Sequence, residues 1–153
     1  MQIDAPIEKT FAIAVPIDLP SIMKPTRFLP GIERVEDQSG NWDHEGQTRR
    51  IYLTDKSSVF EQLTLYQLNE RFSYHVSAFT GPLKHIVSAA NGDWRFQSIN
   101  ATKTNIHWTY AFTLKNIAFA PIVWLLVHGL WSSYIQMALD NVKSIVENSE
   151  EKR

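Results

Sequence analysis

A long apolar segment near the C-terminus constrains the fold of this chain more than any other feature. It reads PIVWLLVHGLWSSYIQMALDNVKSIVEN, from Pro121 to Asn148. In its second half, apolar residues recur every three or four positions, which predicts an amphipathic helix. The expected inner face comprises Trp131, Tyr134 or Ile135, Ala138, Val142 and Ile145. At 1.5 Å per residue the whole helix would be about 40 Å long, enough to cross a small domain.

The first half of this segment is apolar nearly all round, so a membrane-spanning helix is an alternative to a buried one. The apolar run from Ile117 to Trp131 has 15 residues, fewer than the roughly 18 to 20 that span a bilayer. His128 lies inside the run, and the polar residues Ser132, Ser133 and Gln136 follow it. We therefore predict a buried or interfacial helix and no transmembrane segment.

Strand patterns fill most of the chain before this helix. The clearest runs from Thr104 to Leu114, where apolar and polar residues alternate with a strict period of two. A short strand is expected to end within Met1–Asp4, and Leu83–Asn91 suggests a loop or an irregular strand. The remaining predicted strands are Ile32–Glu36, Thr48–Thr54, Ser58–Leu68, Arg71–Phe79 and Gly92–Ile99.

Two short helices are predicted between the first and second strands. Asp4 is expected to cap the first helix, which should stop before Pro16. The Asp18-Leu-Pro20-Ser sequence is a second start signal, for one or two turns that end at Pro25.

This order of elements predicts an α+β fold. Consecutive strands joined by tight turns are antiparallel, and only the long helix is large enough to cover the aromatic face of such a sheet. We expect one domain over residues 1–148 and a charged tail over residues 149–153.

Composition excludes several classes of function. A formal net charge of −1 and a pI near 6.5 argue against a nucleic-acid partner, because no basic surface is available to displace counterions. The chain has no cysteine and begins with MQIDAPIEKTF, which lacks the pattern of a signal peptide. We therefore predict a cytoplasmic protein. Since no histidines and carboxylates have metal-ligand spacing and no Gly-rich phosphate loop is present, we expect neither a metal nor a cofactor.

Several segments resemble the helix-grip superfamily (START-like, or SRPBCC), specifically its polyketide cyclase/dehydrase-like branch. They are IDAPIEKTF, FLPGIERVE, GQTRRIYLTDKSSVFEQLTL, the strand around Tyr74, NIHWTYAFTL and MALDNVKSI. These patterns are specific for fold and weak for function. The resemblance implies a curved seven-stranded antiparallel sheet wrapped around the C-terminal helix, with a cavity for an apolar small molecule between them. It also implies that ligands differ widely among members and that many members are not enzymes. The first strand here looks shorter than is usual for the family.

A bent sheet cannot pack flush along a straight helix, so large side chains between them should leave a concave pocket. We predict that this pocket binds a lipid-like or polycyclic molecule. The predicted wall is mostly aromatic and aliphatic. It comprises Tyr52, Glu61, Leu63, Phe72, Tyr74, Trp94, Phe96, Trp108, Tyr110, Phe112, Val127, Leu130 and Tyr134.

Two polar residues are candidates for chemistry. Glu61 shares the inward register of Leu63, and Arg49 or Arg50 on the paired strand could meet its charge. Such a pair could orient a ligand or transfer protons; a structural ion pair or an outward-facing Glu61 is the alternative. His128 could face the cavity as a base, or could be a hydrogen-bonded core residue.

Three functions are compatible with these features. The first is a carrier or sensor of a hydrophobic molecule, and the second is a cyclase/aromatase-like enzyme that uses Glu61 or a tyrosine. The third is a protein- or membrane-surface module, because Phe119, Trp124 and Leu125 could form an exposed patch. A homodimer through that patch is one form of this third function.

Overall fold

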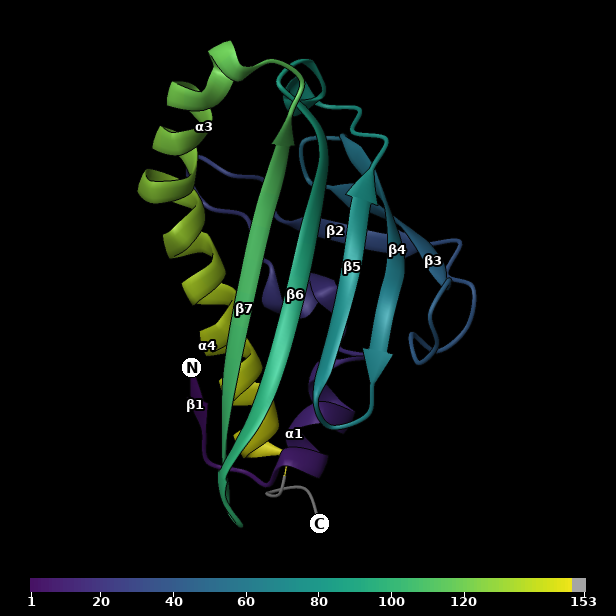
Figure 1. Ribbon diagram of the computed structural model, residues 1–153, viewed down its shortest axis with the longest axis vertical. Helices are drawn as coiled ribbons and strands as arrows, with labels where there is room; N and C mark the ends of the chain where they lie inside the picture. Colours follow the sequence, from purple (N-terminus) through teal and green to yellow (C-terminus); the bar gives the residue numbers. More distant parts are fainter. Residues whose placement is uncertain (150–153) are drawn as a thin grey trace.

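A seven-stranded antiparallel sheet forms the framework of the computed structural model, which describes residues 1–149 (Figure 1). The strand order is β1-β7-β6-β5-β4-β3-β2. The strands are β1 (Gln2–Ile3), β2 (Ile32–Glu36), β3 (Thr48–Leu53), β4 (Ser58–Gln67), β5 (Arg71–Ser77), β6 (Val87–Asn100) and β7 (Lys103–Leu114). Apart from the pairing of β1 with β7, neighbours in the sheet follow one another along the chain, as the turn signals predicted. The predicted tail over residues 149–153 lies outside the described residues except for Ser149.

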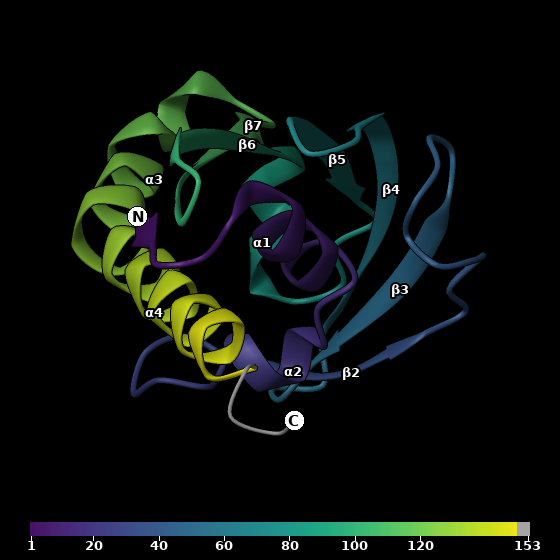
Figure 2. The same ribbon diagram turned by 90° about the horizontal axis from the view of Figure 1, so that it is seen from below.

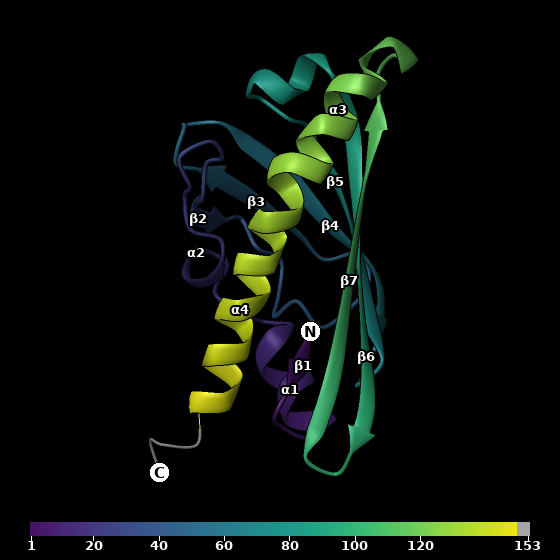
Figure 3. The ribbon, with the colours of Figure 1, turned by 90° about the vertical axis from the view of Figure 1, so that its left-hand side faces the viewer.

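The helices lie on the concave side of this sheet (Figure 2). The sheet forms an open arc around α1, and the C-terminal helix closes the open side (Figures 2 and 3). This is the predicted helix-grip arrangement. The helical segments are α1 (Ile7–Ala14), α2 (Leu19–Ile22), η1 (Pro82–His85), η2 (Ile117–Phe119), α3 (Ala120–Leu126), the π-helical turn η3 (Val127–Trp131) and α4 (Ser132–Asn148).

Strand β6 begins at Val87, earlier than the predicted start at Gly92. This start lies inside Leu83–Asn91, the segment predicted as a loop or an irregular strand; Val87 pairs with Leu114 across an irregular register before the regular ladder continues. The predicted cap of the first helix was wrong. Asp4 does not cap α1: Pro6 occupies the N-cap position and no side chain bonds to it. The Asp4 carboxylate lies instead near Lys103 and Lys143. Asp18 does cap α2, since its Oδ2 accepts a hydrogen bond from the backbone N–H of Ser21.

The lower half of the C-terminal helix anchors the core. Its buried side chains are Tyr134, Ala138, Leu139, Val142 and Val146. Trp131 and Ile145, both predicted on the inner face, are only partly buried. Outside the helix itself, α4 lies closest to α2, α1 and β1. It therefore rests on the short helices and on one sheet edge.

One helix of the described chain, Ile117–Asn148, is long and apolar enough to cross a membrane by length and composition alone. The apolar run in the sequence, Ile117 to Trp131, has 15 residues, whereas the continuous helical segment in the structure has 32. A core helix of a domain satisfies the same test. Only 11% of the window that meets this test is buried. Val142 and Val146 of α4 are fully buried in the core, so the C-terminal part of this helix belongs to the domain.

Gly92 provides a test of how the sheet accommodates its aromatic face. A Cβ at this position would lie 2.1 Å from Cζ of Tyr74, the residue opposite it on β5. We predict that Gly92→Ala lowers the free energy of unfolding by about 1–3 kcal/mol, because the Tyr74 ring must move. Gly129→Ala is the control, since no atom lies within 4 Å of its added Cβ. It should be neutral or stabilising by up to about 1 kcal/mol. Urea unfolding of both variants measures the difference, and equal stabilities would contradict the prediction.

Candidate functional site

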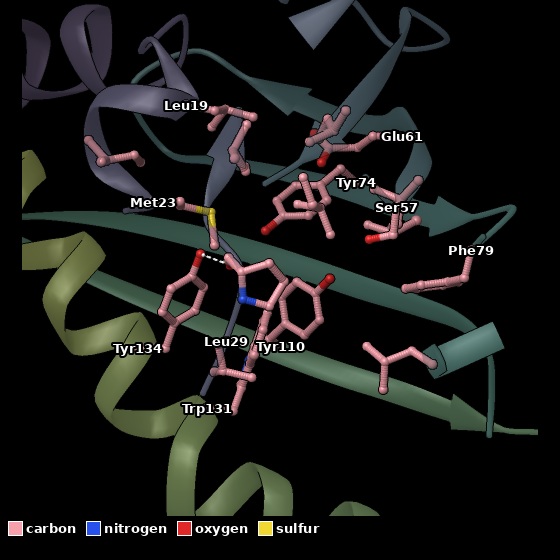
Figure 4. A pocket seen from close by; sticks show the side chains of 18 of the residues that line it. Leu19, Met23, Leu29, Ser57, Glu61, Tyr74, Phe79, Tyr110, Trp131 and Tyr134 are labelled. Carbon is pink, nitrogen blue, oxygen red and sulfur yellow. Dashed lines mark hydrogen bonds between the residues drawn. The ribbon is translucent and has the colours of Figure 1, made fainter. Parts of the chain in front are cut away.

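A cavity of about 340 Å³ lies between the concave face of the sheet and the helices (Figure 4). Its wall combines side chains from β2 to β7 with residues of α1, α2 and the C-terminal helix. Residues 28–30, the β3–β4 turn at Asp55 and Ser57, and residues within 79–83 contribute as well. This volume is within the range of about 300–1,000 Å³ that is typical of small-molecule sites.

Aromatic contacts keep the upper part of the helix away from the sheet. The ring centroid of Trp131 lies 4.9 Å from that of Tyr110 and 5.4 Å from that of Phe112, both on β7. Tyr134 crosses to another wall, where its hydroxyl donates a 2.8 Å hydrogen bond to the carbonyl oxygen of Pro30. These side chains bridge the space between the layers without filling it, which leaves the cavity.

The sheet side of the cavity is a layer of packed rings. Trp94 and Trp108 are opposite each other on β6 and β7, with ring centroids 4.4 Å apart. Phe72 stacks on Trp94 at 5.4 Å, and Tyr74 lies 6.3 Å from Tyr110. Ring pairs in such arrangements stabilise a core beyond their area burial, so this wall is preformed and apolar.

Glu61 and Arg49 form a buried ion pair in this wall. The two residues are directly opposite each other on β4 and β3. Nε and Nη2 of Arg49 donate to Oε1 of Glu61 at 3.0 and 2.5 Å. The guanidinium of Arg49 also lies over the ring of Trp42, with its Cζ atom 3.8 Å from the ring centroid, which is a cation–π contact. Arg50, the other predicted partner, lies over Phe60 instead, because successive residues of a strand face opposite sides.

The second carboxylate oxygen of Glu61, Oε2, has no hydrogen-bond partner among the described residues. Burial raises the pKa of Glu61, and the adjacent Arg49 guanidinium opposes that rise. The site thus offers one carboxylate oxygen that a ligand can bind.

Three tyrosines bring hydroxyl groups to the cavity (Figure 4). Tyr74 accepts a 3.1 Å hydrogen bond from Nε1 of Trp108, and Tyr134 is bonded to Pro30. The hydroxyl of Tyr110 has no such partner within residues 1–149. Burial raises the pKa of Tyr110 and Tyr74 well above the usual range and that of Tyr134 to about 12. All three are therefore neutral at pH 7 and can act as hydrogen-bond donors.

Trp131 adds an unpaired donor. Its Nε1 is buried and has no hydrogen-bond partner among the described residues, a condition shared by Nε1 of Trp42. Buried donors without a partner are rare and costly in folded proteins. Trp131 belongs to the cavity wall, whereas Trp42 does not.

Eight residues of the predicted wall do line the cavity. They are Glu61, Phe72, Tyr74, Trp94, Trp108, Tyr110, Phe112 and Tyr134. Their contact with a ligand stays a prediction.

Three strand residues predicted for the wall lie elsewhere. Leu63 and Phe96 face inward, but they pack in the solid core beside α1, where Phe96 contacts Phe11 at 4.9 Å. Tyr52 lies on the outer side of β3, where its ring carries the guanidinium of Arg34 at 4.0 Å. The cavity occupies only the part of the concave face that α1 leaves uncovered.

Tyr134 of the final helix lines the cavity as predicted, but three other helical predictions were wrong for a different reason. Val127, Leu130 and His128 do not line the cavity. The π-helical turn η3 inserts one extra residue into the helical repeat, so the inward position after Leu126 is Trp131 and not Leu130. His128 is exposed, stacks on Trp124 at 4.5 Å, and its Nδ1 contacts the carbonyl oxygen of Trp124. It therefore cannot act as a base inside the cavity.

Sequence reasoning missed the walls formed by the N-terminal helices and loops. These residues are Ala14, Val15, Ile17, Leu19, Ile22, Met23, Phe28, Leu29 and Pro30. Their signal was present, since apolar residues cluster around Pro16, Pro20 and Pro25 in segments too short to form a core of their own. Within residues 1–149, no group of three His, Cys, Asp or Glu side chains could hold a metal ion.

A family model for polyketide cyclase/dehydrase and lipid transport proteins matches residues 1–147. No curated protein sequence matches the chain.

Solved structures with low sequence identity share the fold. Ara h 8.0201 is similar with a TM-score of 0.72 and 18% identity, over 95% of this chain and 93% of that one. The ZhuI aromatase/cyclase from Streptomyces gives a TM-score of 0.69 and 16% identity, over 96% and 90% of the two chains. A protein from Nitrosospira multiformis gives 0.65 and 14%, over 100% and 96%. At these identities the similarity concerns the fold alone.

The raised pKa of Glu61 predicts a specific pH dependence of stability. The folded state holds this proton more tightly than the unfolded chain, whose carboxyl has a pKa near 4.5. The resulting stabilisation is complete below that pH and is lost as the pH rises through the folded-state pKa. We expect the unfolding free energy of the wild type, relative to Glu61→Gln, to fall in urea titrations as the pH rises above 4.5.

Other carboxylates act in the opposite direction but cancel in this comparison. The pKa values of Asp4, Asp43, Asp93 and Glu147 are lowered, and both proteins contain all four. A relative stability that rises with pH would mean that attraction by Arg49 outweighs the effect of burial.

Proposed function

The chain belongs to the polyketide cyclase/dehydrase and lipid transport family, and from this we propose that it binds a hydrophobic small molecule in the cavity, as a carrier or sensor. The supporting observation is the cavity itself, with its wall of stacked rings and aliphatic side chains. Burial of apolar ligand surface against such a wall provides most of the binding free energy. The absence of cysteine supports the reducing cytoplasm as its location.

Polar groups at the wall constrain which hydrogen-bonding groups such a ligand contains. Oε2 of Glu61 accepts hydrogen bonds, Tyr110 can donate or accept, and Nε1 of Trp131 donates. All three lack partners among the described side chains and backbone. A lipid-like or polycyclic skeleton with one or two hydroxyl or carbonyl groups would satisfy these atoms and bury the remainder. For about 20 non-hydrogen atoms at roughly 0.3 kcal/mol each, the binding free energy is about −6 kcal/mol and the expected Kd is about 40 μM.

A second candidate function is cyclase/aromatase-like catalysis. Two observations favour it: the unpaired Glu61 oxygen shares the cavity with the unpaired Tyr110 hydroxyl, and the family description includes polyketide cyclases. A buried carboxylate of raised pKa is suited to removing a proton next to a ketone, and a neutral tyrosine can donate a hydrogen bond to the developing enolate oxygen.

The binding proposal is tested by filling the cavity. Val76 on β5 lines the wall, whereas Val35 on β2 does not. We expect Val76→Phe to weaken binding of the fluorescent probe 1-anilinonaphthalene-8-sulfonate at least tenfold, because the added ring occupies ligand space. Val35→Phe should bind as the wild type does. Fluorescence titration measures both, and native mass spectrometry of the purified protein should detect an apolar molecule bound 1:1.

Equal probe binding by Val76→Phe and the wild type would contradict the proposal. So would a failure of the wild type to bind the probe and a panel of fatty acids and polycyclic phenols at about 400 μM, a concentration about ten times the expected Kd.

The enzymatic candidate makes a separate prediction. With a linear poly-β-ketone thioester as substrate, Glu61→Gln should reduce cyclisation by about 10²–10⁴-fold, as expected for loss of a general base. Tyr52→Phe, which lies off the wall, should have no effect. Unchanged turnover in Glu61→Gln, measured by product chromatography, would exclude this role for the carboxylate.

A further inference from the structure

Four large apolar side chains project from the start of the C-terminal helix. These are Ile117, Ile122, Trp124 and Leu125, which we call the apolar patch; their exposed fractions are 81%, 57%, 62% and 66%. Residues 1–149 contain seven exposed large apolar side chains in all, so more than half of them belong to this one segment. Gathered exposure of this kind marks an interaction surface.

The patch lies where the helix leaves the rest of the fold. Segment η2 and helix α3 lie at the end of the molecule opposite the β6–β7 hairpin (Figures 1 and 3). The closest backbone neighbours of α3 are the adjoining helical segments η2 and η3. Of its side chains, only Val123 is buried, and Leu126 turns into the cavity wall. The rest of α3 has no protein surface to cover it.

Two lysines lie in the segments next to the patch. Lys115 precedes it, and Lys84 lies in η1, which is joined to this end by a 2.9 Å hydrogen bond from the backbone N–H of Lys115 to the carbonyl oxygen of Ile86. Both lysines are exposed and form no ion pair within the described chain. Residues 82–86 and 115–128 contain His85 and His128 as well, and no aspartate or glutamate.

We propose that the apolar patch docks this protein on the surface of an anionic phospholipid bilayer. Apolar side chains on a helix insert at the boundary between headgroups and acyl chains, and neighbouring lysines are attracted to anionic lipids. Trp124, with its amphipathic ring, is the residue type that favours this interface.

The position of the cavity supports this partner. Pro82 and Leu83 of η1 and Leu126 of α3 all line the cavity, although they belong to the same segments as Lys84 and Leu125. The proposed docking surface therefore adjoins the cavity wall, so an apolar molecule could pass between bilayer and cavity over a short path. Docking itself does not depend on a ligand in the cavity.

A second copy of the chain is a poorer partner for this surface. A two-fold symmetric contact places the same patch on both sides, so Lys84 and Lys115 of the two copies would approach one another. No carboxylate in residues 82–86 or 115–128 could neutralise them. An anionic bilayer provides that neutralisation.

Flotation with lipid vesicles tests the proposal. We expect the wild type to bind vesicles of 70% phosphatidylcholine and 30% phosphatidylserine, and to bind pure phosphatidylcholine more weakly. The Trp124→Ser/Leu125→Ser variant should lose at least tenfold in partitioning, because it removes the inserted side chains. Lys84→Gln/Lys115→Gln should lose about tenfold on the anionic vesicles only, and 0.5 M salt should reproduce that loss.

Leu68→Ser is the matched control. Leu68 is 68% exposed, almost the same as Leu125, but it follows β4 at the opposite end of the molecule (Figure 1). This variant should partition as the wild type does, and circular dichroism should show all variants folded.

A wild type that binds neither kind of vesicle would overturn the proposal, as would an equal loss of vesicle binding in Leu68→Ser. A concentration-dependent dimer that Leu125→Ser abolishes, seen by sedimentation without lipid, would assign the patch to a second copy instead. Loss of vesicle binding with intact binding of the cavity probe would separate docking from the ligand site.

Discussion

The separation of the C-terminal helix from the sheet depends on a small set of rings. Trp131 on the helix meets Tyr110 and Phe112 on β7 at centroid distances near 5 Å, while α4 rests on the short helices and on β1. The helix is thus fixed firmly at one end and held away from the sheet at the other. A strongly curved sheet supplies the remaining concavity. The cavity results from that arrangement, and the start of the helix is left exposed.

The fold could be predicted from the sequence because local patterns and the global arrangement agree. The period of two in β7, the turn signals between strands and the amphipathic second half of the final helix each specify one element. The errors fell where a pattern was interrupted. The irregular register near Val87 concealed the start of β6, and the π-helical turn around Gly129 shifted the inward face of the helix by one residue. Neither feature has a distinct periodicity in the sequence.

The site was predicted in part, for a physical reason. Strand alternation assigned the inward faces of Glu61, Tyr74 and Trp108 correctly, but Tyr52, also predicted for the wall, lies on the outer side of β3. Alternation gives no information on depth, so Phe96, which is buried under α1, was expected there too. The residues around Pro20 that close the cavity lie in short helical segments between β1 and β2, outside every strand. Their position depends on tertiary packing, which no local pattern encodes.

The two ends of the long helix experience opposite requirements. Around Val142 and Val146 the inward side chains of the helix are buried in the hydrophobic core. Around Trp124 and Leu125 it carries apolar surface that the fold leaves in water, at a cost in free energy that grows with exposed area. A π-helical turn, a feature often found at functional sites, separates the two regimes. Leu126 lines the cavity, while its neighbour Leu125 faces outward. A partner that covers the outer face of α3 would therefore contact the helix that forms part of the cavity wall. The proposed docking surface and the cavity wall therefore share a single turn of helix.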